Sequence, residues 1–324
     1  MEIFEIAEVL HRAESYPVVL GTLVSVEGSS YRRAGARLLL TAQDQRLGSI
    51  SGGCLESDLT LRARLLMSST RRTDLVEYDT TGENDLVWGV GTGCHGVVHI
   101  LLERIESMPT WAQAVSKSYT QRRSTRLAVA WGGQLGSALG TRLADHDELP
   151  SDGVLLNPVP PPLRLVIFGA GDDAIPLTEL CRDLGWIPIV IDPRPEMATP
   201  QRFPAAHEVR CISAEVAPTQ LDWDDRTVAV IMTHHYRYDL PLLQVLGKMN
   251  LTYLGLLGPK QRGQRLLRDA GLPGDCPLHS PVGLDLGGDG PAAVALSVVA
   301  EIQAHLHGRT ASNLNQRIRS IHAD

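Results

Sequence analysis

The chain has 324 residues, 43% of them hydrophobic, and a formal net charge of −7. The length favours two domains, and the hydrophobic content is that of an ordinary globular protein. The acidic balance argues against sequence-independent nucleic-acid binding, which needs a basic surface, and no run of 18 apolar residues suggests a membrane span. We therefore expect neither nucleic acid nor a membrane as a partner.

The N-terminus and the cysteines point to a reducing compartment. The first residues are acidic and amphipathic, without the basic start and apolar stretch of a secretory signal. The cysteines are odd in number and scattered, with no Cys-x-x-Cys spacing: Cys54, Cys94, Cys181, Cys211 and Cys276. This pattern favours reduced thiols over a disulfide framework or a zinc site, so a cytoplasmic protein is expected.

Residues 1–150 are predicted to form a mixed α/β domain. Apolar spacing and β-branched runs predict a helix at 3–13, strands at 18–26, 37–41 and near 50, a helix at 55–66, and strands at 73–79, 97–102 and 126–131. Four prolines in the six residues from Asn157 to Pro162 then predict a stiff, extended linker over 151–162.

Residues 163–324 show a clearer alternation. Strands are predicted at 163–168, 187–191, 227–233 and 253–257, and helices at 174–184, 241–247, 259–270 and 291–307. Alternating strands and helices favour a parallel, doubly wound sheet. The predicted fold class is therefore α/β, with an N-terminal mixed α/β domain followed by a Rossmann-like parallel-sheet domain.

A dinucleotide-binding pattern opens this second domain. Gly169-x-Gly171-x-x-Ala174 lies between a predicted strand and a predicted helix, and Asp192 follows 23 positions after Gly169 at the end of the next strand. The glycines would allow a tight turn and close approach to a pyrophosphate, and Asp192 could accept from a ribose hydroxyl. Asp172 and Asp173 disfavour a pyrophosphate through like charge. NAD(P) binding and a purely architectural Rossmann frame both remain open.

A dehydrogenase would also need an acid–base group. Only Thr233-His234-His235 after a predicted strand offers one in this domain. The two adjacent histidines should point in different directions, and we interpret them as ordinary loop residues.

The segment from Gly48 to Glu56 is the most informative part of the first domain. It carries Ser51, two adjacent glycines, Gly52 and Gly53, then Cys54 and a predicted helix. Glycines let the backbone approach a ligand, and the N–H groups of a helix start suit an anion. The alternative is a buried cysteine at a tight strand-to-helix turn.

Two further loops strengthen the hypothesis of a ligand site. The stretch from Glu27 to Arg37 combines small hydroxyl residues with arginines, which recognise phosphate bidentately, and the stretch from Gly89 to Gly96 contains a second cysteine. The alternative for the first stretch is a solvated basic loop. A pocket with both cysteines and the arginines would suit a phosphorylated ligand with soft-atom chemistry.

These segments resemble the xanthine dehydrogenase accessory family of the XdhC/CoxI type. Its first-domain motifs correspond to 28–36, 48–56 and 88–96, and its Rossmann domain to 165–174, 190–194, 232–234, 255–262 and 281–287. Three residues depart from the family pattern: Tyr31 replaces a proline, His95 a glycine, and His235 a frequent aspartate.

The resemblance implies a molybdenum cofactor chaperone, more a maturation factor than an enzyme. Such a protein holds molybdopterin-bound molybdenum, supports its sulfuration with a cysteine desulfurase, and delivers it to a xanthine dehydrogenase-type apoenzyme; a homodimer is expected. Cys54 and Cys94 are the candidate metal contacts. The candidate cofactor-binding residues are Ser29, Ser30, Arg32, Arg33, Ser51, Gly52, Gly53, Cys54, Glu56, Gly93 and Cys94, with Gly169, Gly171 and Asp192 for NAD(P). The alternative function is an NAD(P)-dependent oxidoreductase, and a scaffold role in dimerisation or docking is compatible with either.

Overall fold

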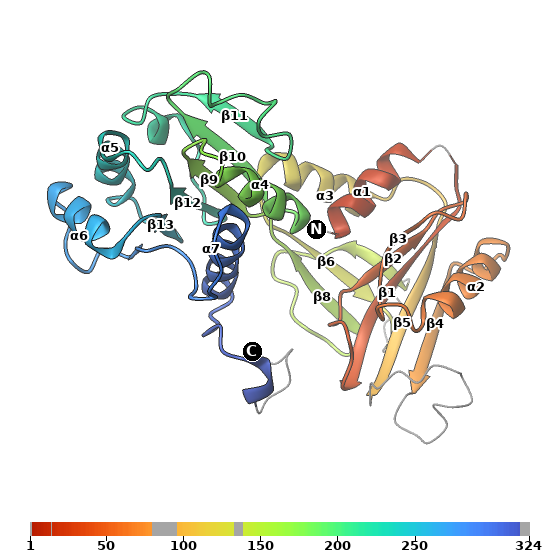
Figure 1. The fold of residues 1–324 in the computed structure, drawn as a ribbon. Helices are drawn as coiled ribbons and strands as arrows, with labels where there is room; N and C mark the ends of the chain where they lie inside the picture. Colours follow the sequence, from red (N-terminus) through yellow and green to blue (C-terminus); the bar gives the residue numbers. More distant parts are fainter. Residues whose placement is uncertain (1, 14, 80–95, 133–138, 318–324) are drawn as a thin grey trace. The chain divides into compact units, whose positions relative to one another are not determined.

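The computed structural model describes residues 2–13, 15–79, 96–132 and 139–317. The chain divides between Pro161 and Pro162 into two compact units, each drawn in Figure 1. The first unit is mixed α/β and the second is built on a parallel sheet, as predicted.

A five-stranded antiparallel sheet forms the centre of the first unit, in the order β3-β2-β1-β5-β4. Its strands are β1 (Val18–Gly28), β2 (Arg37–Leu40), β3 (Arg46–Gly48), β4 (Thr73–Asp79) and β5 (Gly96–Ile105). Helix α2 (Glu56–Met67) packs Leu59, Ala63 and Leu66 against one face of this sheet. That packing fixes the start of α2, and Cys54 lies two residues before it.

The other face of this sheet is covered by α1 (Glu2–Arg12), α3 (Thr110–Gln121) and a second sheet of order β7-β6-β8. The second sheet consists of β6 (Thr125–Ala130), β7 (Gly140–Leu143) and β8 (Val154–Val159). Alternation along β1 separates the two cores: Val19 and Leu23 face α2, whereas Val18 and Leu20 face α1 and α3.

The predicted linker is wrong over half of its length, because β8 occupies Val154–Val159. Pro158 lies in register with Arg126 of β6. Strand β8 is at the edge of its sheet, where a residue without an N–H group is tolerated. Proline content alone did not distinguish an edge strand from an extended linker.

The second unit contains a six-stranded, all-parallel sheet in the order β11-β10-β9-β12-β13-β14. Its strands are β9 (Arg164–Phe168), β10 (Ile187–Asp192), β11 (Glu208–Cys211), β12 (Thr227–Ile231), β13 (Leu254–Leu256) and β14 (Leu278–His279). Counted within the unit this order is 3-2-1-4-5-6, the dinucleotide-binding arrangement. The prediction of a Rossmann domain is confirmed.

Helices cover both faces of this sheet. One core contains residues of α4 (Ala174–Asp183) and α7 (Pro291–Leu306), and the other contains residues of α5 (Tyr236–Leu246) and α6 (Lys260–Asp269). Helix α5 begins five residues before the predicted start at Pro241, which lies inside the helix. Two 3-10 helices (Ala217–Gln220 and Leu314–Gln316) complete the described elements.

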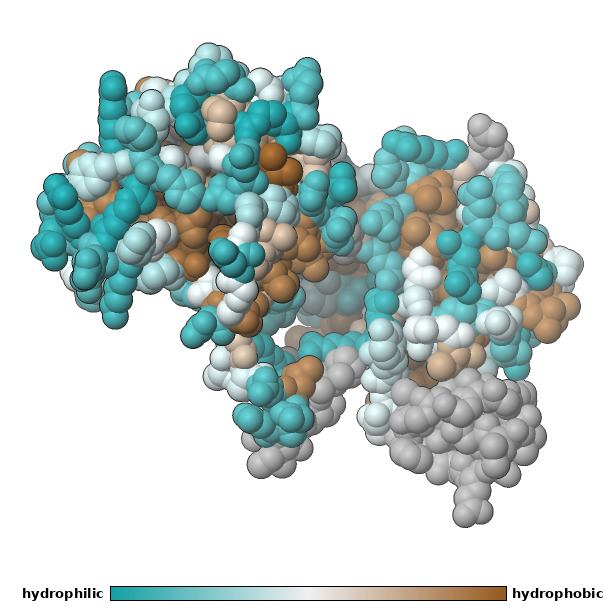
Figure 2. All heavy atoms as spheres, viewed as in Figure 1, coloured by the Kyte–Doolittle hydropathy of each residue, from teal (hydrophilic) through white to brown (hydrophobic). Residues whose placement is uncertain are grey.

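No helix of the described residues is long and apolar enough to cross a bilayer. Hydrophilic residues predominate on the face shown in Figure 2, with hydrophobic residues between them. This distribution follows from the buried cores of the two units, which take most of the aliphatic side chains.

Candidate functional site

Glu56, the first residue of α2, folds back into the turn that precedes it and is only 1% exposed. Its Oε1 accepts from the Ser49 hydroxyl (2.8 Å) and from the N–H groups of Ile50 (2.9 Å) and Ser51 (2.8 Å). Its Oε2 accepts from the Gly53 N–H (2.8 Å) and from the Ser51 hydroxyl. One carboxylate therefore holds the whole turn.

The electrostatics of Glu56 follow from these contacts. Burial opposes its ionisation, but the hydrogen bonds from Ser51, Ser49 and Ile50 outweigh it and lower the pKa of Glu56 to about 2. The N–H groups that the sequence offered to a ligand phosphate are thus engaged by the chain's own carboxylate. We therefore reassign Glu56 from ligand contact to positioning residue.

Acid should weaken the first unit through Glu56. Because its folded-state pKa is lowered from 4.5 to about 2, the stabilisation is complete above about pH 4.5 and is lost as the pH falls toward 2. As the pH is lowered between these values, the free energy of unfolding of the wild type should decrease more steeply than that of Glu56→Gln. Urea unfolding at a series of pH values measures both. Parallel slopes for the two proteins would contradict this assignment.

Cys54 is exposed at the end of this turn. Gly52 and Gly53 have φ of +75° and +125°, a region that strongly favours glycine, and they turn the chain outward just before the cysteine. The alternative of a buried structural cysteine is wrong.

The arginine-containing loop lies beside the Cys54 turn. A Cβ placed on Gly52 would lie 2.8 Å from Cε1 of Tyr31, so the Tyr31 ring covers this glycine. Tyr31 itself is 63% exposed. Arg32 donates to the Ser49 carbonyl (3.0 Å) and to Glu2 of α1 (2.9 Å). Arg32 therefore braces the turn, while Ser29 and Arg33 are exposed on the same loop.

Gly96, the last residue of the third glycine-rich segment and the first of β5, lies beside the arginine-containing loop. Gly96 is in register with Gly28 of β1, and a Cβ on it would lie 2.6 Å from the carbonyl oxygens of Glu27 and Ser29. Gly93, Cys94 and His95 lie outside the described residues, so the two-thiol pocket stays a prediction. In the described ranges, no group of three or more His, Cys, Asp or Glu side chains is suited to a metal ion.

In the second unit, Gly169 is required by strand packing. Its φ is +123°, and a Cβ would lie 2.5 Å from the carbonyl oxygen of Met232, just after β12. A Cβ on Gly171 would meet a side-chain oxygen of Asp173 at 2.7 Å. The two glycines of the motif therefore have different roles here: Gly169 serves the sheet and Gly171 lies on the open turn.

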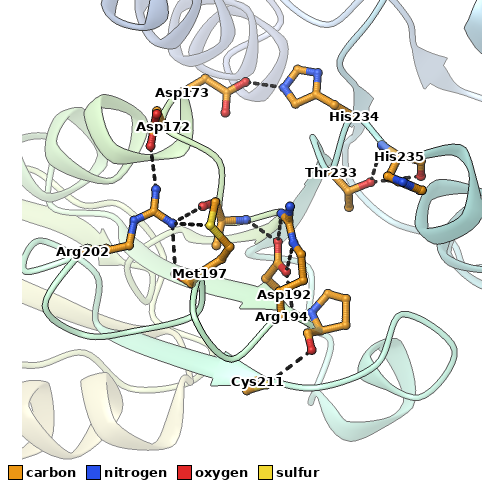
Figure 3. A network of polar contacts seen from close by, with 12 residues as sticks. Asp172, Asp173, Asp192, Arg194, Met197, Arg202, Cys211, Thr233, His234 and His235 are labelled. Carbon is orange, nitrogen blue, oxygen red and sulfur yellow. Dashed lines mark hydrogen bonds and ion pairs between the residues drawn. The ribbon is translucent and has the colours of Figure 1, made fainter.

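Asp192 is completely buried at the end of β10 (Figure 3). Its Oδ1 accepts from the N–H (2.9 Å) and Nε (2.8 Å) of Arg194, and its Oδ2 from Arg194 Nη2 (2.7 Å) and the Ala170 N–H (2.8 Å). Burial opposes ionisation, but these bonds outweigh it and lower the pKa of Asp192. A carboxylate has about four acceptor positions, so none is left for a ribose hydroxyl.

The two acids of the Gly169 turn are also paired (Figure 3). Arg202 Nη2 contacts Asp172 at 2.6 Å, and His234 Nε2 lies 2.6 Å from Asp173. The hydrogen bond to Asp173 raises the pKa of His234, which has a φ of +56°. The ring of His235 instead lies 5.1 Å from that of Tyr238, so the adjacent histidines diverge as predicted.

Known proteins match both units of this arrangement. Family models described as "XdhC Rossmann domain" and "XdhC and CoxI family" match residues 165–302 and 11–79. A Bacillus subtilis protein, named as a probable xanthine dehydrogenase subunit, is 35% identical over 305 residues, covering 88% of this chain and 92% of its own. The chain belongs to the XdhC and CoxI family.

Two other proteins are similar to this XdhC and CoxI family member, one in sequence and one in both sequence and structure. The Escherichia coli molybdenum cofactor insertion chaperone PaoD is 26% identical over 289 residues, 88% of this chain and 82% of its own. A crystal structure described as a xanthine dehydrogenase from Bacillus halodurans is 30% identical with a TM-score of 0.83, covering 97% of this chain and 98% of its own.

One arginine of this family member's basic loop is not available to a ligand. Arg37 is 3% exposed and donates to the Gly35 carbonyl (3.1 Å) and to Asn157 of β8 (2.9 Å). Burial lowers the pKa of Arg37 to about 10, against the opposing effect of Glu103 and Glu2. The three arginines therefore differ in role. Arg37 is buried and bonded to β8, Arg32 holds the Cys54 turn, and Arg33 is exposed.

His234 was the residue that sequence reasoning undervalued. Its place beside the Gly169 turn depends on a contact with Asp173, 61 positions earlier in the chain. The family resemblance includes Met232 to His234, so the sequence did mark this segment. That His234 pairs with Asp173 is seen only in the folded unit.

Proposed function

We propose that this chain binds the molybdenum cofactor, protects it and delivers it to a xanthine dehydrogenase-type molybdoenzyme. The observation that carries the proposal is the exposed Cys54 thiol on a turn held rigid by Glu56 and bordered by Tyr31 and Arg32. The names of the B. subtilis and E. coli relatives support the same role.

The chemistry of the site suits this cargo. A soft thiolate is a suitable contact for molybdenum. The exposed Arg33, two residues after Tyr31, would meet the terminal phosphate of the pterin, for which a planar guanidinium is well shaped. Glu56 and Arg32 take no part in that contact; they keep the turn in one conformation, which lowers the entropy lost on binding.

An exposed thiol also suits transfer between proteins. Cofactor held at Cys54 would remain accessible to a cysteine desulfurase for sulfuration and to the receiving apoenzyme. We infer that the chain acts in the cytoplasm, since the described cysteines are all free thiols. A homodimer is proposed on the family resemblance alone.

Loss of Cys54 should abolish cofactor retention. Purified protein is mixed with molybdenum cofactor released from a donor molybdoenzyme and desalted, and bound molybdopterin and molybdenum are measured. Wild type and Cys211→Ala should retain the cofactor, and Cys54→Ala at least tenfold less. Cys211 is the matched control because its thiol is also exposed. Equal retention by the two variants would refute the role of Cys54, and no retention by the wild type would refute the function.

We propose a second, separate property, nucleotide binding by the Rossmann unit with NAD(P) as the ligand class. It is supported by the 3-2-1-4-5-6 strand order and by the Gly169 turn. An oxidoreductase activity would require His234 as its acid–base group, and His234 is engaged with Asp173. A substrate screen by nicotinamide absorbance tests this alternative.

A further inference from the structure

The end of β10 presents a guanidinium where an NAD-binding site presents a carboxylate. Asp192 is 0% exposed and lies behind Arg194, whose side chain is 35% exposed. All four acceptor positions of Asp192 are filled, three of them by Arg194. A ribose 2′-hydroxyl arriving here would find no acceptor, and displacing Arg194 would leave a buried carboxylate partly unpaired, which is costly.

We propose that the nucleotide taken by this Rossmann unit carries a phosphate on its ribose 2′ position, as NADP(H) does. This inference rests on the proposed nucleotide binding. Arg194 donates to Asp192 through its N–H, Nε and Nη2, so within the described residues Nη1 has no hydrogen-bond partner and can donate to a phosphate. An arginine at this strand end is the group that receives a 2′-phosphate in Rossmann domains.

The environment of Arg194 favours an anion of this kind. Two rigid bonds to Asp192 orient the guanidinium plane, so little side-chain entropy is lost when a phosphate binds. Arg202 lies at the same end of the sheet, but its guanidinium is already paired with Asp172, so Arg194 is the residue that would meet the phosphate (Figure 3). Besides Asp192 itself, the carboxylate that acts on Arg194 is that of Glu196, which is exposed.

The turn before α4 carries a negative charge that disfavours phosphate binding. Asp173 precedes α4, the helix whose N-terminus would face a pyrophosphate, and one of its oxygens is buried without a hydrogen-bond partner in the described part of the chain. Its other oxygen is held by His234. The negative charge of Asp173 weakens the binding of every dinucleotide by the same factor, whereas Arg194 distinguishes a 2′-phosphate from a hydroxyl. The two residues therefore have separable effects.

The test is calorimetric titration of the full chain with NADP⁺, NAD⁺, adenosine 2′,5′-bisphosphate and 5′-AMP. NADP⁺ should bind at least tenfold more tightly than NAD⁺, and the bisphosphate more tightly than 5′-AMP. Arg194→Gln should bring both ratios close to one. Arg210→Gln, on the neighbouring strand and paired with Glu208, should leave them unchanged. Asp173→Asn should increase the affinities for NADP⁺ and NAD⁺ by the same factor.

The outcomes separate the two proposals. If NAD⁺ binds the wild type as tightly as NADP⁺, the 2′-phosphate inference is wrong and nucleotide binding stands. If neither ligand binds the wild type or Asp173→Asn at millimolar concentration, both are wrong. Should Arg194→Gln fail to fold, Arg194→Lys keeps the charge but not the planar fork, and a reduced preference for NADP⁺ is expected.

Discussion

Glu56→Gln should lower the free energy of unfolding by about 3 kcal/mol, since a carboxyl pKa lowered from 4.5 to about 2 corresponds to that order of magnitude. A neutral amide would present an NH₂ group to a turn in which three backbone N–H groups, those of Ile50, Ser51 and Gly53, can only donate. Some of those buried donors would lose their acceptor. Urea unfolding of the full chain at neutral pH measures the effect.

A matched control is available on α1. Among the described residues Glu8 pairs with Arg12, and both side chains are exposed, so Glu8→Gln should change stability by less than about 0.5 kcal/mol. If Glu56→Gln were as mild as this control, the turn would not depend on the carboxylate.

The same variant distinguishes positioning from contact. Glu56→Gln should reduce molybdopterin retention together with stability, because a loosened turn no longer presents Cys54 in one conformation. Cys54→Ala should reduce retention with little change in stability, since the thiol is exposed. If Glu56→Gln were destabilised yet retained cofactor fully, the positioning role would be wrong.

Gly169→Ala should destabilise the second unit by about 3 kcal/mol or more, through backbone strain and overpacking. Its φ of +123° is unfavourable for alanine, and the new methyl group would lie 2.5 Å from the Met232 carbonyl oxygen and 2.8 Å from the Thr233 nitrogen. These are backbone atoms at the end of β12, so the clash is relieved only by separating two central strands, β9 and β12.

Gly171→Ala is the control within the same motif. Its methyl group would meet only the end of the Asp173 side chain, whose displacement strains the contact with His234 but moves no strand, so the expected loss is about 1 kcal/mol. Thermal unfolding compares the two variants, and equal losses would contradict the separate roles. Gly171→Ala should instead weaken nucleotide binding, because it narrows the approach to the open turn.

The Rossmann unit was largely predictable from the sequence. Its strands are short apolar runs bounded by glycine, proline and aspartate, and its helices follow at regular intervals, so local patterns carry the information. The elements that were missed are β11 and β14, which are short, and α3, β7 and β8 in the first unit. In β8 the edge position, a property of the whole sheet, made Pro158 acceptable.

The sequence by itself determined the α/β class, the order of most elements and the glycine-rich turns, because these depend on periodicity and on backbone freedom at single residues. Only the tertiary structure decided what the polar residues do. Glu56, Asp192 and Arg37 have side chains suited to a ligand, but each is buried and bonded within the chain. Residue type states which hydrogen bonds a group can make, whereas packing decides which partner is within reach. Among the described residues, Cys54 and Arg33 are exposed and the Arg194 guanidinium is partly exposed, so these side chains can meet a ligand.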